Sequence, residues 1–477
     1  MQVVISSLLK EKKSLLKELI QELSKEFEYA SVLATDSKGT AFLVRKKTIQ
    51  AEDSLLCTEC GYVVRVFNGS GYSEYSFDDI ESVASCVAKV KEVAKNDVAE
   101  LKKAGISFLQ YPVIKEDSVE ATFFAEISQP LNALKASEKI ERMTDVMNSA
   151  FAYKSELIDF VVRYEEVQVS KMFISTKKDL EQSYVYSVGY LIPYIKSKDA
   201  VKYSVKSFSA LSGSELLDVM KENVQKVCNN VTDSLKAEPI VPGEYDIICA
   251  PEVTGLIAHE AFGHGVEMDM FVKNRAKAKD YIGKQVASGV TEMHDGAKAA
   301  TQVSSYLFDD EGVLAQDTCI IKDGILKTGM CDLLASMQLG IQPTGNGKRE
   351  SFERKAYTRM TNTFFSSGNA TVNEMIASVK KGYLLEGYFS GMEDPKNWGI
   401  QCAVEKGREI VDGKLTGKIV GPIFLTGYVP TLLSSISMIS CEGDFSLCGA
   451  GYCGKGYKEY VRVSMGGSYI KAVGRLG

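Results

Sequence analysis

Two of the three histidines in this 477-residue chain lie five residues apart, and a glutamate directly follows the first of them. His259, Glu260 and His264 belong to the segment HEAFGHG, residues 259–265. Imidazole nitrogens are common zinc ligands, and a neighbouring carboxylate can take a proton from water that the ion activates. Because histidine is so scarce in this chain, this segment is its strongest candidate for chemistry. The chemistry that we expect there is metal-assisted hydrolysis.

The spacing of the two histidines differs from that of the familiar metal-binding helix motif. In H-E-x-x-H the imidazoles stand four residues apart and share one face of the helix. His259 and His264 are five apart, which on a regular helix turns them about 140° away from each other. A local π-helical turn takes in one extra residue and restores a shared face. We therefore predict a distorted helix at Phe262–Gly263, where Gly263 supplies backbone freedom.

The charges of these side chains suggest a role for each. Two neutral imidazoles leave zinc a strong Lewis acid, which lowers the pKa of its bound water toward about 7. Glu260 directly follows His259 and does not easily reach the same ion. We expect Glu260 to be the general base that takes the proton from the water and passes it to the leaving amine. His259 and His264 are the expected ligands, and zinc is the expected cofactor.

A catalytic zinc site usually takes a third ligand from the protein. Glu267 lies three residues after His264, and His294 is the remaining histidine. Cys448 and Cys453 lie in the glycine-rich segment CGAGYCGKG. A single cysteine more often serves as a small buried apolar side chain. Spacing alone does not choose among these four candidates.

The elements that position the histidines can be predicted from the apolar pattern. Residues 245–250 have the pattern of a buried strand, and Pro251 suits the first turn of a helix, where its missing N–H costs nothing. The histidines therefore lie on a helix that follows a buried strand. Further along, the Asp-Gly pairs within 320–327 and 410–417 predict two-residue hairpins. The second half of the chain is thus expected to be rich in antiparallel strands.

The first half mixes helical and strand patterns. Apolar residues at helical spacing predict an amphipathic helix within residues 1–30. Alternating runs at 157–169 and 184–195 predict strands. The expected fold class is α+β, with a mixed α/β N-terminal half that contains antiparallel hairpins. The β-rich antiparallel C-terminal half carries the metal-site helix.

A proline-containing stretch indicates where the chain divides. Pro239 and Pro242 lie close together in the polar segment KAEPIVP, which is typical of a linker. We predict an N-terminal α+β domain at 1–238 and a C-terminal catalytic domain at 239–477. A break near 105–115 would divide the first domain into two subdomains.

Composition and charge exclude several classes of protein. The chain has 56 basic and 62 acidic residues, and a net charge of −6 provides no basic surface for nucleic acid. Its eleven cysteines lack framework spacing, which favours a reducing cytoplasm, and the apolar stretch before Lys10 is too short for a signal peptide. The uncharged segment 419–441 contains prolines and glycines, which favour strand, turn and helix over a membrane span. We expect a cytoplasmic protein that binds neither nucleic acid directly nor a membrane.

The pair Cys57 and Cys60 has C-x-x-C spacing. No second pair follows at the distance of a zinc ribbon, so a structural zinc site is not expected there. The role of the two cysteines stays open, as does that of Cys448.

Six sequence blocks resemble the TldD/PmbA family of metallopeptidases, also called modulators of DNA gyrase. They occur in the order of the family and are HEAFGHGVEMD (259–269), DDEG (309–312), IIKDGILK (320–327), PTGNGKRES (343–351), RMTNT (359–363) and CGK (453–455). The resemblance implies that His259, His264 and Cys453 hold the metal and that Glu260 is the general base. Cys448 has no counterpart in the family. PmbA-type members lack HExxxH, so the intact motif indicates a catalytic member of the TldD type.

The resemblance also implies a substrate and a partner. The substrate would be an extended or unfolded polypeptide that enters an internal site within a dimer, formed with a second copy or with a PmbA-like chain. Within PTGNGKRES, Arg349 is either a substrate-facing group or a solvated residue of a structural turn.

Two positions depart from the family pattern. Met268 stands where the family usually has glycine, and Tyr457 stands near a usual glutamine. These departures leave two alternatives open. One is a non-catalytic interaction protein or partner subunit, and the other is hydrolysis of a non-peptide amide, because a site's chemistry does not encode its substrate.

Overall fold

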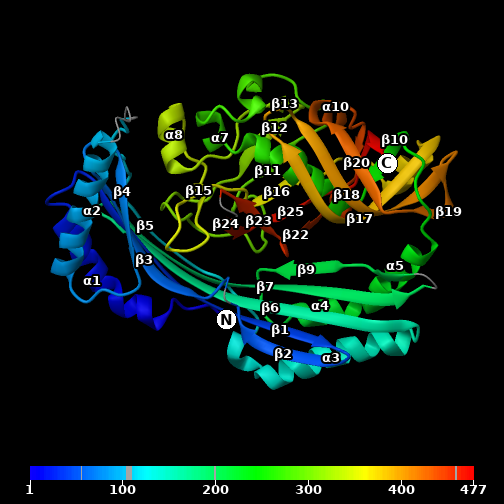
Figure 1. Ribbon diagram of the computed structural model, residues 1–477, viewed down its shortest axis with the longest axis horizontal. Coiled ribbons are helices and arrows are strands. Elements are labelled where there is room, and N and C mark those ends of the chain that lie inside the picture. Colours follow the sequence, from blue (N-terminus) through cyan, green and yellow to red (C-terminus); the bar gives the residue numbers. More distant parts are fainter. Residues whose placement is uncertain (55, 104–109, 198–199, 457–458) are drawn as a thin grey trace.

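The computed structural model describes residues 1–54, 56–103, 110–197, 200–456 and 459–477 (Figure 1). Helices and mostly antiparallel sheets are both abundant, and the predicted α+β class is confirmed. The N-terminal part forms one long sheet, and the C-terminal part lies against one face of it (Figure 1). No helix among the described residues is long and apolar enough to cross a membrane.

Nine strands of the described residues form the N-terminal sheet, in the order β4-β3-β1-β6-β7-β5, with β2 on β1 and both β8 and β9 on β7. All neighbours are antiparallel except β5 and β7. The strands are β1 (Ala30–Arg45), β2 (Thr48–Asp53), β3 (Glu59–Phe67), β4 (Tyr72–Phe77), β5 (Val119–Phe124), β6 (Leu157–Ser175), β7 (Lys178–Lys196), β8 (Val201–Tyr203) and β9 (Lys206–Ala210).

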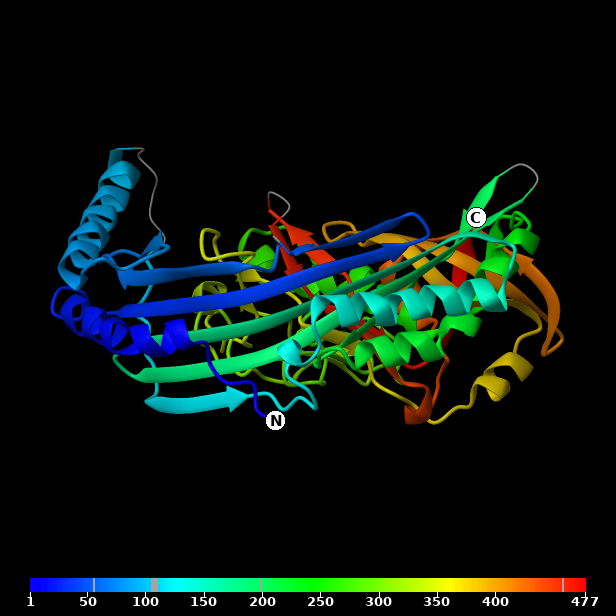
Figure 2. The same cartoon turned by 90° about the horizontal axis from the view of Figure 1, so that it is seen from below.

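Helices cover the face of this sheet that points away from the C-terminal part (Figure 2). They are α1 (Ser7–Leu23), α2 (Val83–Lys103), α3 (Ala136–Tyr153), α4 (Leu216–Glu222) and α5 (Val224–Lys236). Leu131 of the short helix η1 (Leu131–Ala133) packs instead against the cluster that contains Val303 and Ala450. Along β1, Val32 packs with α1 and α2, whereas Val44 packs with α3, α4 and α5. Because alternate residues of a strand share a face, both helix groups lie on one side of the sheet. The predicted amphipathic first helix is confirmed as α1.

The C-terminal part contains a seven-stranded sheet, a six-stranded sheet and two separate two-stranded ribbons among its described residues. The seven-stranded sheet contains β10 (Gly243–Cys249), β17 (Lys381–Asp394), β18 (Gly399–Val411), β19 (Lys414–Val420), β20 (Ile423–Tyr428), β21 (Met438–Ile439) and β26 (Ile470–Leu476). The six-stranded sheet contains β11 (Met293–Asp295), β12 (Thr318–Lys322), β13 (Ile325–Leu326), β16 (Asn362–Phe365), β22 (Ser446–Cys448) and β25 (Ser464–Gly467). The ribbons are β14 (Gly347–Lys348) with β15 (Tyr357–Thr358), and β23 (Tyr452–Lys455) with β24 (Glu459–Arg462).

Both predicted Asp-Gly hairpins are present, between β12 and β13 and between β18 and β19. Asp323 and Gly324 have φ values of 51° and 75°, and Asp412 and Gly413 have 47° and 75°. Two consecutive positive φ angles are the mark of a type I′ turn, which matches the twist of the strands it joins. The sheets are not antiparallel throughout, because β10 runs parallel to β17 and β16 runs parallel to β25.

The helices of the C-terminal part are short. They are α6 (Pro251–Leu256), η2 (Ile257–Gly263), η3 (His264–Val266), α7 (Asp269–Val272), η4 (Lys277–Tyr281), α8 (Leu333–Leu339), α9 (Val372–Ala377), α10 (Val429–Ser434) and η5 (Glu442–Asp444). The continuous helical segment α6–η2–η3 lies in the main hydrophobic core, which side chains of both larger sheets complete. The uncharged segment 419–441 is divided among β19, β20, α10 and β21.

Buried ion pairs join the two parts of the molecule. Arg65 of β3 lies 2.7 Å from Glu311, and Lys171 of β6 pairs with Asp310. After α5 the chain leaves the N-terminal sheet and enters β10 at Gly243. The domain division at 238/239 stays a prediction. The proposed break near 105–115 falls partly on residues 104–109, outside the described residues.

We predict that Gly255→Ala destabilises the protein, although alanine normally stabilises a helix by about 1 kcal/mol relative to glycine. A Cβ at Gly255 would lie 2.5 Å from the backbone nitrogen of Gly466, because α6 packs directly on β25. Relieving such overpacking typically costs about 1–3 kcal/mol. The midpoint of thermal unfolding should therefore fall.

The matched control is Gly289→Ala. A Cβ at Gly289 meets no atom within 4 Å, so this variant should unfold at the temperature of the unmodified protein. Equal midpoints for both variants would contradict the close-packing argument.

Candidate metal centre

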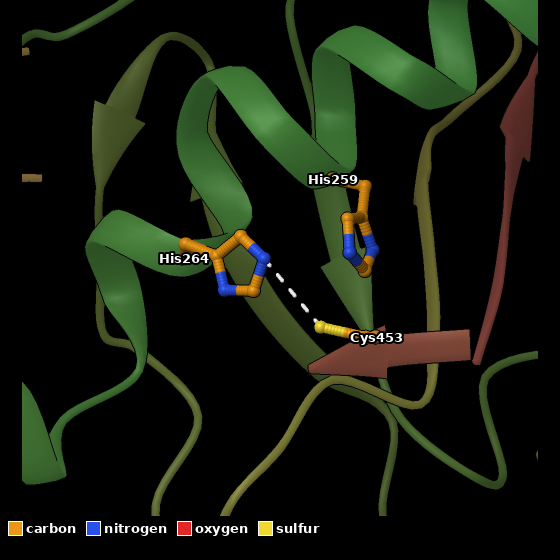
Figure 3. A group of neighbouring side chains, drawn as sticks. All are labelled: His259, His264 and Cys453. Atoms are coloured by element: carbon orange, nitrogen blue, oxygen red, sulfur yellow. Dashed lines mark hydrogen bonds between the residues drawn. The ribbon is translucent and has the colours of Figure 1, made fainter. Parts of the chain in front are cut away.

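The histidine helix is distorted as predicted. Pro251 stands in the first turn of α6, directly after β10, and the backbone becomes π-helical over Ile257–Gly263. The N–H of His264 donates to the carbonyl of His259, five residues back, which is the π-helical pattern. The distortion is longer than the single turn predicted at Phe262–Gly263. It brings both imidazoles to the same side of the helix (Figure 3).

Gly263 acts by its size and not by backbone freedom, which corrects our expectation. Its φ of −57° and ψ of −51° are ordinary helical values that any residue adopts. A Cβ at this position would instead lie 2.3 Å from the sulfur of Met360 and 3.0 Å from the carbonyl oxygen of Ala258. The glycine therefore lets the distorted helix pack closely against the segment that contains Met360.

His259, His264 and Cys453 lie together (Figure 3). The Sγ of Cys453 is 3.5 Å from Nε2 of His264, and the imidazole centroids are 5.0 Å apart with planes at 81°. One candidate ligand atom of each residue lies within 4.8 Å of the other two. A tetrahedral zinc ion with ordinary Zn–N and Zn–S bonds holds its nitrogen and sulfur ligands about 3.6 Å apart. The spacing of these atoms therefore fits zinc.

The electrostatics of the three side chains also suit a metal. Burial alone would raise the pKa of Cys453, but the imidazoles of His264 and His259 hold it well below its ordinary value. A thiolate is the form in which cysteine binds zinc. Nδ1 of His259 is buried and has no hydrogen-bond partner among the described residues. A thiolate with two imidazoles is a typical zinc donor set.

Glu267, one of the four candidates for the third ligand, lies on the side of the His264 ring that faces away from Cys453. Its Oε2 is 3.0 Å from Nδ1 of His264, while Nε2 of the same ring points toward Cys453. Burial would raise the pKa of Glu267, but Lys455 and then His264 hold it far below its ordinary range. A carboxylate on the outer imidazole nitrogen fixes the orientation and tautomer of a ligating histidine.

The structure separates the other two candidates from the histidine pair. His294 lies between Glu292 and Asp317, at 2.8 and 2.6 Å, and stacks on Phe364. Cys448 lies 3.4 Å from Oγ of Ser207, on the N-terminal sheet. Of the four candidates, Cys453 is the one that joins His259 and His264.

Glu260 lies beside this group, with Oε2 3.9 Å from Nε2 of His264. Its side chain is 21% exposed, and burial raises its pKa although the imidazoles act in the opposite direction. Gly391 of β17 stands directly against it, because a Cβ there would lie 2.6 Å from Cγ of Glu260. Next along β17, Glu393 accepts a hydrogen bond from the N–H of Gly265.

Sequence reasoning missed the supporting residues Arg359, Gly391, Glu393 and Lys455. Lys455 donates to Asp269 at 2.7 Å and lies 3.2 Å from Glu267, and Arg359 donates to the carbonyl oxygen of Cys453. Lys455 and Arg359 do lie in the blocks CGK and RMTNT, but nothing in those blocks indicates which carboxylate or carbonyl they bind.

The structure also shows the surroundings of other residues that the sequence singled out. Arg349 is buried and pairs with Glu74 of β4 at 3.0 Å, so it is neither solvated nor free to meet a substrate. Met268 is buried in the core against Gly329. Among the described residues, Cys57 and Cys60 belong to no group of three potential metal ligands. Tyr457 lies outside the described residues.

Comparisons with known proteins show what this chain is similar to. The family model described as "PmbA/TldA metallopeptidase C-terminal domain" matches residues 242–473. A protein of Methanothermobacter thermautotrophicus named "Metalloprotease" is 25% identical over 463 residues, or 95% of this chain and 96% of the relative. A "Zinc metalloprotease TldD homolog" of Saccharolobus solfataricus is 34% identical over 251 residues, or 52% of this chain and 54% of the relative.

A solved structure shares the fold over nearly the whole length. The crystal structure of TldE from Thermococcus kodakarensis has a TM-score of 0.74 at 17% identity, and the match covers 97% of this chain and 99% of that one. The matched C-terminal family model, the full-length relatives and the common fold together lead to one conclusion. This chain belongs to the TldD/PmbA family.

Proposed function

We propose that this chain is a zinc-dependent peptidase of the TldD type. His259, His264 and Cys453 would hold the ion, and Glu260 would be the general base. The observation that carries the proposal is the convergence of two imidazoles and a thiolate beside a partly exposed carboxylate, with the sulfur 3.5 Å from Nε2 of His264. The relatives named metalloprotease support the same class of reaction.

When bound, zinc supplies a Lewis acid that lowers the pKa of a coordinated water and polarises the scissile carbonyl. Glu260 takes the proton from the attacking water and later delivers it to the leaving amine. Its position beside His264 suits this role. Partial burial raises the pKa of Glu260, which makes its carboxylate a stronger base. Glu267 keeps Nε2 of His264 directed toward Cys453 by engaging Nδ1.

The substrate that we propose is an extended or unfolded polypeptide. The enzyme would work as a dimer, with a second copy or with a PmbA-like chain, and the TldE structure that shares its fold supports the second arrangement. We also propose a cytoplasmic location, because the eleven cysteines lack the spacing of a disulfide framework.

The experiment that tests the function is Glu260→Gln, assayed on unfolded polypeptides and by metal analysis. We expect the purified unmodified chain to contain about one zinc per chain, as one three-ligand site requires, and to cleave these substrates. The variant should keep the zinc and lose at least about 100-fold in kcat, the lower range for a lost general base.

Three outcomes would contradict parts of the proposal. Full activity of Glu260→Gln would remove the general-base role. If the unmodified chain binds no zinc, the alternative is favoured: a non-catalytic interaction protein, or a partner subunit in a complex with a PmbA-like chain. Zinc binding with cleavage of small amides, but not of polypeptides, would favour a different substrate class.

Cysteine substitutions test the third ligand. We expect Cys453→Ser to weaken zinc binding strongly, because serine replaces a thiolate that the two imidazoles stabilise. Cys448→Ser is the matched control, since Cys448 lies in the same segment but contacts Ser207. Zinc affinity measured by competition with a chelator should separate the two variants. Equal affinities would contradict the assignment of Cys453.

A further inference from the structure

The ribbon that carries Cys453 is not part of either larger sheet. Among the described residues, β23 pairs with β24 alone. Ladder hydrogen bonds to a larger sheet therefore do not fix its position directly. Side-chain contacts contribute to it, together with the chain connection from β24 into β25 of the six-stranded sheet. The two faces of the ribbon contact different parts of the molecule, because alternate residues of a strand point to opposite sides.

One face of the ribbon points to the metal centre. Cys453 and Val461, which oppose each other in the ladder, both lie in the core that contains the histidine helix. The neighbouring pair, Tyr452 and Arg462, points the other way, toward the N-terminal sheet. A displacement of Tyr452 and Arg462 would thus move the backbone that carries the thiolate.

Tyr452 and Arg462 fit into a polar socket on the N-terminal sheet, formed by Cys57, Glu165 and Tyr186. The guanidinium of Arg462 donates to the carboxylate of Glu165 and, at 2.6 Å, to the hydroxyl of Tyr452. It also stacks on the Tyr452 ring, with its carbon 3.7 Å from the ring centroid. The same hydroxyl lies 3.0 Å from Sγ of Cys57, and the hydroxyl of Tyr186 lies 3.5 Å from that sulfur.

Glu165 is the charged member of the socket. Its side chain is 17% exposed and that of Arg462 is 8% exposed, so the pair is largely screened from water. Removing one partner of such a pair leaves the other charge buried and uncompensated. Arg462 would keep its hydrogen bonds to Tyr452 and to the carbonyl oxygen of Ala450 but lose its countercharge, and we expect the guanidinium to shift and the ribbon to move with it.

Packing is incomplete on this side of the ribbon, although Tyr452 lies against the apolar cluster that contains Cys57, Tyr186 and Val303. Two cavities, of about 120 and about 600 Å³, are both lined by Tyr452 and Arg462. The smaller also borders Tyr186 and Lys348, and the larger borders Phe42 and Glu165. Since open space flanks the pair, its position depends largely on the ion pair and on its hydrogen bonds, one of which runs from Arg462 to the carbonyl oxygen of Ala450.

We propose that the Glu165–Arg462–Tyr452 contact positions Cys453 for the metal, so that the N-terminal sheet, which supplies no ligand of its own, completes the metal centre. Glu165 and Arg462 are positioning residues in this proposal. The inference rests on the ligand set proposed above, and it gives Cys57 a role as a partner of Tyr452.

The chain itself offers a matched control in the residue next to Glu165. Glu166 follows it in β6, points to the opposite face of the sheet and pairs with Lys139 of α3. That pair is also buried, with side chains 6% and 5% exposed. Glu165→Gln and Glu166→Gln therefore each remove one carboxylate charge from a buried ion pair, but only the first pair contacts the ribbon of Cys453.

The experiment compares the two variants in the full-length protein. Zinc affinity is measured by competition with a chelator, and Co²⁺ replaces zinc so that the thiolate–cobalt charge-transfer absorption reports on the sulfur ligand. We expect Glu165→Gln to bind zinc about 10-fold more weakly, the lower end of the effect of losing a direct partner of a ligand, because Glu165 acts on Cys453 through Arg462 and the ribbon. It should also show a reduced thiolate–cobalt band. Glu166→Gln should match the unmodified protein in both measurements, whatever its thermal stability.

Tyr452→Phe tests the same contact if Glu165→Gln fails to fold. It removes the hydroxyl that bridges Arg462 and Cys57 but keeps the ring beneath the guanidinium. We expect a several-fold loss of zinc affinity and a weaker thiolate–cobalt band.

Two results would overturn the inference. One is an unchanged zinc affinity and cobalt spectrum in Glu165→Gln or in folded Tyr452→Phe. The other is an equal loss in Glu165→Gln and Glu166→Gln, which would indicate general destabilisation. Failure of the proposed function is distinguishable, because it would appear in the unmodified protein as absent zinc or absent peptidase activity.

Discussion

The buried carboxylate of Glu267 connects the two chain segments that carry the proposed ligands. It engages Nδ1 of His264 on the helix side, and Lys455 lies 3.2 Å away on the ribbon side. Arg359 lies 3.9 Å from its other oxygen and also donates to the backbone carbonyl of Cys453. A buried charge is tolerated only where partners compensate it, so Glu267 requires these cations in place. This requirement constrains the relative position of the histidines and the cysteine from one face of the ribbon, while Glu165 and Arg462 act on the other.

Close backbone approach is the second condition for this arrangement. Gly263 lets the distorted helix approach Met360, and Gly255 lets the preceding turn touch β25. Gly391 of β17 leaves room for Glu260. The helix is therefore closely packed on several sides, against the backbone of β25, the side chain of Met360 and Gly391 of β17. Such confinement can maintain a π-helical backbone, which is less favourable than a regular helix and is found mostly where function requires it.

The parts of the fold that could be predicted from sequence are those that depend on neighbouring residues. The Asp-Gly turns have a local cause, as do the first helix, the helix start at Pro251 and the distortion between the histidines. The proposed third ligand has no such local cause. Cys453 is 189 residues from His264, and no sequence pattern around a cysteine identifies the residues that it contacts. Only the family resemblance indicated it. Arg349 was misjudged for the same reason, since its partner Glu74 lies 275 residues away.

The distance in sequence between the ligands also sets an order of events during synthesis. At about 5–20 residues per second, a ribosome needs roughly 10–40 s to add the 189 residues between His264 and Cys453. During that interval the nascent chain has both imidazoles but not the thiolate, nor Lys455 and Arg462, which hold the ribbon in place. The N-terminal sheet, by contrast, has been synthesised completely by then. The proposed three-ligand metal centre would thus be assembled late, on a scaffold that is already present, and all three ligands could retain an ion only after the second half of the chain has folded against the first.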